Sequence, residues 1–155
     1  MNRSLSFFII ISGIIITSCT ESQDETGIIQ VRYGTSFGEC IGYCLREMKL
    51  EKELITYNRS GWNDTIFPIT CTDIHGNQDW HSFLTSLDTD SFFELSETIG
   101  CPDCADGGAE WLEIEMTGGE KHRVTFEYQN EPSLLADYVS ELRSMMESFE
   151  SCEGQ

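Results

Sequence analysis

The pattern that most narrows the possible folds is a change of hydrophobic period in the C-terminal third. Apolar and polar residues alternate along 112–116 and again along 124–128, and a Gly-Gly turn at 118–119 separates the two runs. From Leu134 to Phe149, after Pro132, apolar residues instead recur every three or four positions. Alternation is typical of a half-buried strand, and the longer period is typical of an amphipathic helix. We therefore expect a hairpin followed by a helix of about four turns that covers one face of a sheet.

The upstream part of the chain carries further strand and helix signals. Strands are expected at 28–33, 43–50 and 54–57, with a Gly-rich turn at 34–38. An edge strand is expected at 65–72, because Pro68 cannot donate a ladder hydrogen bond. Asn77 is a candidate N-cap for a short helix with an apolar stripe from Trp80 to Leu87, and 91–95 is expected to form another helical turn. The predicted fold class is α+β: an antiparallel sheet of four to six strands, with the C-terminal helix and a shorter helix packed on one face and disulfides as staples.

The N-terminal segment resembles a bacterial lipoprotein signal. Arg3 supplies its positive charge, an apolar run follows over 5–16, and Ile16-Thr17-Ser18-Cys19 has the spacing of a lipobox. The apolar run is shorter than the roughly 20 residues that a membrane-spanning helix needs. The resemblance implies cleavage before Cys19 and acylation of Cys19 with diacylglycerol and a further chain such as palmitate, which together give stable anchoring. The alternative is an ordinary signal peptide, or a membrane anchor, that ends at a cysteine by chance.

These boundaries divide the chain into three parts. Residues 1–18 are the removable signal, 19–27 an acidic tether, and 28–152 a single α+β domain. The acidic tether resembles the export signals that send some lipoproteins of Gram-negative bacteria to the outer face of the outer membrane. We therefore expect a lipid-anchored protein of the bacterial cell envelope, located at the outer membrane. The acidic tether is also compatible with exposure on the cell surface.

The mature chain is strongly acidic. The full chain has a net charge of −18, and removal of Arg3 with the signal leaves 8 basic side chains against 27 acidic ones, a net of −19. Such a charge repels nucleic acid and anionic head groups, so we expect neither nucleic-acid binding nor electrostatic attachment to the membrane. A protein partner that is steered by charge would be basic.

Six cysteines follow Cys19, namely Cys40, Cys44, Cys71, Cys101, Cys104 and Cys152. Disulfides persist outside the cytoplasm, so two or three are expected, and the sequence does not choose among the 15 possible pairings. The metal alternative is a zinc site made by the Cys40/Cys44 and Cys101/Cys104 pairs, whose spacing suits thiolate ligands. Asp103 and Asp106 are candidate calcium ligands, although their spacing does not match an EF-hand loop. Because oxidation competes with metal binding in this compartment, we assign no metal and no cofactor.

Two short motifs have the spacing of catalytic sites. Cys101-Pro102-Asp103-Cys104 is a C-x-x-C, as in thioredoxin-like proteins, but no helix is expected after it to stabilise a thiolate. Gly34-Thr35-Ser36-Phe37-Gly38 matches the G-x-S-x-G of hydrolases, but it follows the first strand of a chain too short for that fold. No catalytic residues are therefore assigned. The tryptophans Trp62, Trp80 and Trp111 are expected as core or edge aromatics.

The segment Ser36-Phe37-Gly38-Glu39-Cys40-Ile41-Gly42-Tyr43 is similar to the Cys-Phe-Gly-x-Cys-Pro-x-Tyr segment of a family of small exported bacterial lipoproteins of unknown function. The order of the later elements, over about 28–148, also resembles that family. Ser36 stands where the family has a cysteine, and Ile41 stands where it has a proline. The local disulfide that the family pattern implies therefore cannot form, and Cys44, Cys71 and Cys101 are the candidate partners of Cys40.

The resemblance supports the fold and implies no activity. We expect a non-catalytic binding or interaction domain at the cell envelope, such as an inhibitor, an adaptor or an accessory subunit. The alternative is a thiol–disulfide redox protein that uses the Cys101–Cys104 pair.

Overall fold

The computed structural model describes residues 26–63, 65–74 and 77–154. Its elements follow one another as β1 (Ile28–Ser36), β2 (Leu45–Glu51), β3 (Leu54–Ser60), β4 (Ile69–Ile74), α1 (Asn77–Thr85), α2 (Thr89–Phe93), β5 (Thr98–Ile99), η1 (Cys104–Asp106), β6 (Ala109–Met116), β7 (Lys121–Glu127), η2 (Ser133–Leu135) and α3 (Ala136–Ser148). The predicted signal at 1–18, Cys19 and most of the 19–27 tether lie outside the described residues, as does the side chain of Asn77. None of the helices within the described residues is long and apolar enough to cross a membrane.

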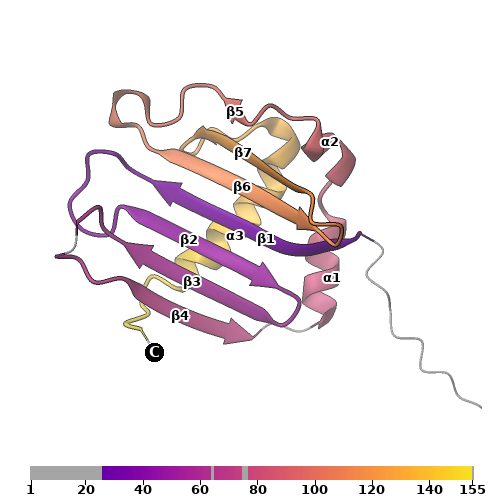
Figure 1. The fold of residues 1–155 in the computed structure, drawn as a ribbon, viewed down its shortest axis with the longest axis horizontal. Helices are drawn as coiled ribbons and strands as arrows, with labels where there is room; N and C mark the ends of the chain where they lie inside the picture. The colour runs from indigo at the N-terminus through magenta and orange to yellow at the C-terminus, as the bar shows by residue number, and fades with distance from the viewer. Residues whose placement is uncertain (1–25, 64, 75–76, 155) are drawn as a thin grey trace, which may run out of the picture.

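Seven strands form one sheet in the order β4-β3-β2-β1-β6-β7-β5. Neighbouring strands are antiparallel, except that the two-residue strand β5 pairs in parallel with β7. Helices α1 and α3 lie on the same face of this sheet, behind it in Figure 1. The α+β prediction is therefore confirmed, and β5 is an addition to it. Strand β4 begins directly after Pro68 and lies at an edge of the sheet, as the proline predicts.

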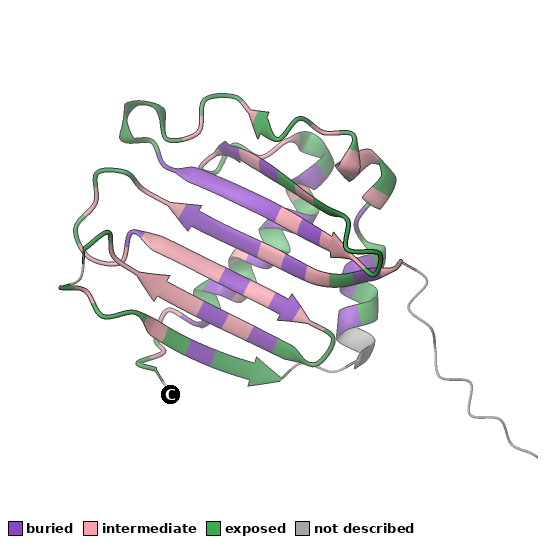
Figure 2. Cartoon of the chain, in the orientation of Figure 1, coloured by how far each residue is buried: buried purple, intermediate pink, exposed green. Residues whose placement is uncertain are grey.

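The hydrophobic core fills the space between the sheet and these helices (Figure 2). Alternate residues of each central strand point into it, as Tyr33 of β1 and Leu112 of β6 show. Helix α3 buries the stripe that its period predicts, made of Tyr138, Val139, Leu142 and Met146. The ring of Phe83 in α1 stacks on the ring of Tyr138 in α3, with centroids 4.3 Å apart. The two helices and the sheet thus share one core.

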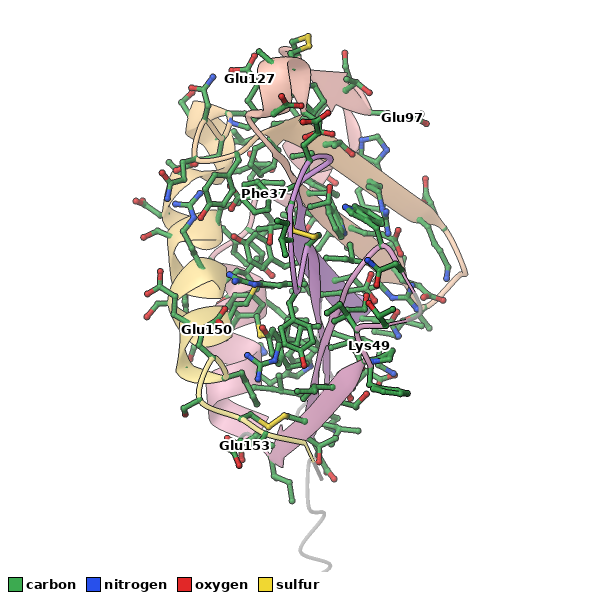
Figure 3. The ribbon with its side chains drawn as sticks, turned by 90° about the vertical axis from the view of Figure 1, so that its left-hand side faces the viewer. Phe37, Lys49, Glu97, Glu127, Glu150 and Glu153 are labelled. Carbon is green, nitrogen blue, oxygen red and sulfur yellow. A yellow bond between two sulfur atoms is a disulfide. The ribbon has the colours of Figure 1, made fainter. Side chains whose placement is uncertain are left out.

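The other face of the sheet is open to solvent. Viewed from one end of the strands, α3 lies on one side of the sheet and Lys49 points to the other (Figure 3). Charged side chains pair on this open face, including Lys49 with Glu51 at 2.9 Å and Arg123 with Glu113 at 2.8 Å. An antiparallel sheet with one dry and one wet face explains the strict alternation of the hairpin.

Gly34 lies inside strand β1 and not in the expected turn at 34–38. The indole of Trp111 lies on it, and a Cβ at this position would come within 2.2 Å of Trp111 Cζ2. Glycine is needed here for close approach of a ring to the backbone, which in sequence looks the same as a turn former. Strand β1 therefore continues to Ser36. The next element is strand β2 and not the helix that the nucleophile elbow of a hydrolase requires.

Candidate interaction surface

The six cysteines form three disulfides, Cys40–Cys44, Cys71–Cys152 and Cys101–Cys104. The expectation of disulfides is confirmed, and the partner of Cys40 is Cys44. The four cysteines of the zinc alternative lie in two separate disulfides, so they offer no thiolate ligands. In the part of the chain that the structure describes, no three potential ligand side chains come close enough to hold a metal ion.

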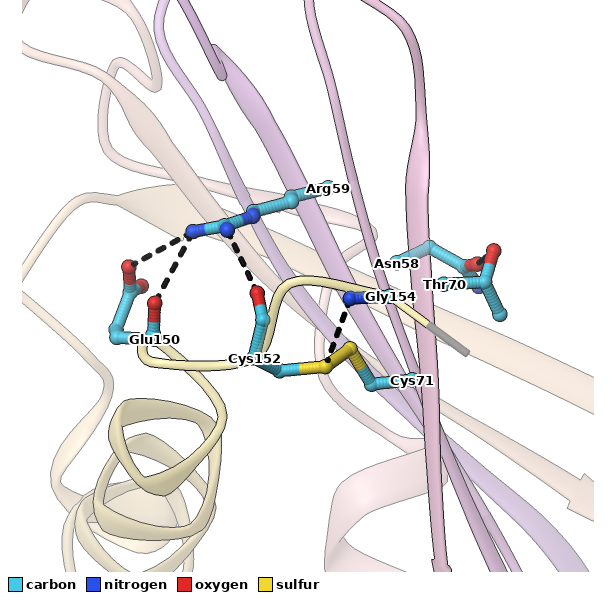
Figure 4. Close-up of a disulfide and its surroundings, with 7 residues drawn as sticks. All are labelled: Asn58, Arg59, Thr70, Cys71, Glu150, Cys152 and Gly154. Atoms are coloured by element: carbon cyan, nitrogen blue, oxygen red, sulfur yellow. Dashed lines mark hydrogen bonds and ion pairs between the residues drawn. A yellow bond between two sulfur atoms is a disulfide. The ribbon is translucent and has the colours of Figure 1, made fainter.

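The Cys71–Cys152 disulfide ties the C-terminal tail to edge strand β4 (Figure 4). Arg59 of β3 reinforces this link, because its Nη1 donates to the Glu150 carbonyl at 3.1 Å and its Nη2 to the Cys152 carbonyl at 2.7 Å. Cys71 is only 2% exposed. This disulfide therefore holds the end of α3 against the sheet and is structural.

The Cys40–Cys44 disulfide closes a five-residue ring between β1 and β2. At its base the backbone N–H of Phe37 donates to the Cys44 carbonyl at 3.0 Å. Ile41 in this ring is fully exposed, and Gly42 beside it has a φ of 101°, which favours glycine. A covalent ring thus presents an apolar side chain to solvent.

The loop between β3 and β4 lies against this ring. Trp62 Nε1 donates to the Phe37 carbonyl at 2.7 Å, and a Cβ at Gly61 would lie 2.8 Å from the Gly42 carbonyl oxygen. Trp62 is 55% exposed and Phe67 of the same loop is 81% exposed. We call the exposed apolar side chains of these two loops, Ile41, Trp62 and Phe67, the loop-tip surface.

The loop-tip surface lies at the opposite end of the sheet from the point where the chain enters the domain. In Figure 1 the chain enters β1 at the right, and the β1–β2 and β3–β4 loops are at the left. A nine-residue strand spans about 30 Å. The surface is thus held well away from residue 28, where the predicted tether ends.

The Cys101–Cys104 disulfide lies in a third loop near this end, and both of its cysteines are exposed. The loop is backbone-strained: Asp103, Ala105 and Asp106 have φ of 60°, 51° and 59°, a region that favours glycine. The N–H of Cys101 donates to Glu127 Oε1 at 2.9 Å, and this bond, followed by one from Asn130, lowers the pKa of Glu127. No α-helix begins at Cys104, only the three-residue turn η1. The carboxylate beside Cys101 and the missing helix both disfavour a thiolate.

The helix-facing side of the sheet is polar at the same end. Direct cross-strand neighbours there are Arg59 of β3, Arg46 of β2, Thr35 of β1 and Glu110 of β6. We call these four residues the polar row. They occupy the face on which the rest of each strand is apolar.

Glu110 anchors one end of the polar row to helix α3. It is fully buried, and its carboxylate accepts from the Tyr33 hydroxyl, from Arg143 Nη2 at 2.9 Å and from the N–H of Gln129 at 2.9 Å. Burial, and then the negative charge of Glu110, raise the pKa of Tyr33 well above its ordinary value. The tyrosine therefore stays protonated and donates. A buried carboxylate with all of these donors is a structural link, not an acid–base catalyst.

No protein-family model matches the chain, and a comparison with curated proteins finds no match. The resemblance to small exported lipoproteins therefore stays a prediction, as does acylation of Cys19.

Sequence reasoning missed the loop-tip surface and the polar row. Trp80 and Trp111 are buried as expected, whereas Trp62 is exposed on a loop. The available signal for the surface was an apolar residue between closely spaced cysteines, as at Ile41. The signal for the polar row was a charged residue at a core-facing position of a strand, as at Glu110.

Proposed function

We propose that this chain is a lipid-anchored binding domain of the bacterial cell envelope, held to the membrane by acyl chains on Cys19. The loop-tip surface carries the binding function. Burial of an apolar side chain of this size contributes about 1.5–3 kcal/mol, yet a disulfide holds Ile41 in solvent and a hydrogen bond holds Trp62 there. Rigidly presented apolar anchors lose little entropy on binding and dominate interface energies.

The proposed partner is a protein with an apolar pocket and a basic rim. The chain as a whole has a net charge of −18, and the exposed Glu39 directly precedes the disulfide ring. The negative field of the chain would raise the association rate of a partner with a basic rim. The disulfide ring at 40–44 carries no cation that would repel such a rim. An inhibitor, an adaptor or an accessory subunit would all use such a surface.

Photo-crosslinking in the native host tests the binding function. A photoreactive phenylalanine analogue replaces Ile41 in one variant and Ile74 in the control, which is 80% exposed at the other end of the sheet. We expect one discrete adduct from position 41, reduced at high salt, and none from position 74. Equal adducts from both positions, or none from position 41, would contradict the proposal.

Metabolic labelling tests the anchor separately. Cells given a fatty acid with a terminal alkyne should attach it to the wild-type chain, and Cys19→Ala should abolish the label. The same variant should leave the membrane fraction, because the acyl chains supply the attachment. Label that persists in Cys19→Ala would place the anchor elsewhere.

The second candidate function is thiol–disulfide exchange at the Cys101–Cys104 pair. Its support is that these two cysteines are bonded to each other in an exposed loop. After reduction, a redox-active Cys101 would react with a maleimide at about pH 6 because its thiolate is stabilised. The carboxylate of Glu127 beside it favours the opposite result, with no reaction until about pH 8. Fast reaction at the lower pH would replace the binding proposal by the redox one.

A further inference from the structure

The two ends of the polar row differ in charge balance. At one end, Glu110 and Glu131 both accept hydrogen bonds from Arg143. At the other end, Arg46 and Arg59 stand directly opposite each other across β2 and β3. They share one carboxylate, that of Glu150, at 3.0 Å and 3.9 Å. Like charges directly opposite destabilise a sheet, and one carboxylate shared between two guanidinium groups offsets this only in part.

Hydrogen-bond donors are also in surplus at this end. The Nε atoms of Arg46 and Arg59 are buried and have no partner among the described residues. Thr35 is 5% exposed, and its hydroxyl takes part in none of the hydrogen bonds within the described part of the chain. A buried donor without a partner costs about 1–3 kcal/mol. Thr35 lines a cavity, so a ligand there could accept a hydrogen bond from its hydroxyl.

A cavity of about 60 Å³ lies between the sheet and α3 at this place. Thr35, Arg46 and Arg143 line it together with Met146, and Glu147 and Glu150 also contribute. A single water needs roughly 10–15 Å³, so the cavity has room for a group of several atoms. Arg143 donates to Glu110 from Nε and Nη2 and to Glu131 from Nη2. Its Nη1 takes part in no hydrogen bond within the described residues.

We propose that this cavity binds a small monocarboxylate, of the size of acetate. Thr35, Arg46 and Arg143 line one cavity, and the Thr35 hydroxyl and Arg143 Nη1 are unused within the described residues. Guanidinium groups bind carboxylates with two parallel hydrogen bonds. A space of about 60 Å³ suits a short acid. The carboxylates of Glu147 and Glu150 disfavour a second negative charge, so sulfate and the phosphate dianion do not fit. This site is independent of the loop-tip surface and of the proposed partner.

The test is thermal unfolding of the full chain in a non-ionic detergent, titrated with sodium acetate against sodium chloride at equal ionic strength. Acetate should raise the Tm saturably, because it binds the folded state alone. Thr35→Val keeps the side-chain shape and removes the hydroxyl, and Arg46→Gln removes the charge. Each should weaken acetate binding about tenfold, judged against the ligand-free Tm of the same variant. Arg123→Gln, on the open face of the sheet, is the matched control and should bind as wild type does.

Three results would overturn this inference. If acetate raises the Tm no more than chloride, or if Thr35→Val binds acetate as tightly as wild type, the cavity holds water alone. If sulfate stabilises the chain as strongly as acetate, the site accepts anions in general and the monocarboxylate assignment is wrong.

Discussion

Gly34 lies where the ring of Trp111 meets the backbone of β1, and this contact leaves no room for a side chain. A Cβ at position 34 would come within 2.2 Å of the ring and 2.7 Å of the Arg46 carbonyl oxygen. Because neither a packed ring nor a paired strand can move away freely, we expect Gly34→Ala to lower the free energy of unfolding by about 2–3 kcal/mol in urea denaturation. Gly118→Ala, with no atom within 4 Å, should change it by less than about 0.5 kcal/mol. Equal effects would show that Trp111 does not constrain position 34.

Glu131 links stability to pH through Arg143. The hydrogen bond from Arg143 Nη2, at 2.8 Å, is the main cause that lowers the pKa of Glu131 below its ordinary 4.5. The folded state therefore binds this proton less tightly than the unfolded state, and the stabilisation exists above the ordinary pKa and is lost as pH falls through the folded one.

We expect Glu131→Gln to cost about 1 kcal/mol at about pH 7 and progressively less between about pH 5 and pH 3. The measurement is the Tm difference from wild type across this range. Glu153→Gln, which changes an exposed carboxylate, should show no such trend. A difference that stays constant with pH would mean that the carboxylate charge does not matter.

The three disulfides close loops of very different length. Each is expected to stabilise the fold according to the entropy that its loop removes from the unfolded chain. Cys71 and Cys152 are 81 residues apart, whereas the other two pairs are separated by 4 and 3 residues. Loop-closure entropy gives about 4 kcal/mol for the long loop and about 2 kcal/mol for each short one. Paired Cys→Ser variants should follow this order in urea unfolding. If removal of Cys40–Cys44 cost as much as removal of Cys71–Cys152, the ring would be part of the fold and not a device for presenting Ile41.

The hairpin β6–β7 and helix α3 could be predicted from the sequence because each buries one face. A buried face makes apolar residues recur every two positions in a strand and nearly every four in a helix. The polar row does not follow in the same way. Glu110 shares a face with Leu112 and Ile114. In the sequence, however, a charged residue next to a run of alternating apolar residues suggests that the strand has ended. Only the register between strands shows that Arg46, Thr35 and Glu110 lie side by side.

The cysteine pairing and strand β5 could not be predicted from the sequence, because both depend on contacts between distant parts of the chain. The two residues of β5 carry no period, and their pairing with β7 depends on where the preceding helices place the chain. Cys71 and Cys152 meet because the tail that follows α3 returns to edge strand β4. Tertiary contacts, and not local preference, decide both features.

The charges of the molecule are distributed unevenly over its surface. Four of the basic residues, Arg32, Lys49, Lys121 and Arg123, lie on the open face of the sheet. Carboxylates pair with them there, such as Glu115 with Lys121 at 2.8 Å and Glu51 with Lys49 at 2.9 Å. The open face is therefore close to neutral, and the acidic surplus lies on the helices and loops. A basic partner would be steered toward the loops and away from this face.

The position of the loop-tip surface relative to the predicted anchor gives a direct optical test. Trp62 is 55% exposed, whereas Trp80 and Trp111 are 3% and 6% exposed, so the difference between wild type and Trp62→Phe isolates the fluorescence of the loop tip. The surface lies about one strand length, or about 30 Å, from the start of β1. For the lipidated chain in neutral vesicles we therefore expect aqueous acrylamide to quench the Trp62 component and brominated phospholipid to leave it unchanged. Quenching by the brominated lipid would mean that Trp62 and Phe67 lie in the bilayer, and the loop tips would then be a second membrane contact and not a protein-binding surface.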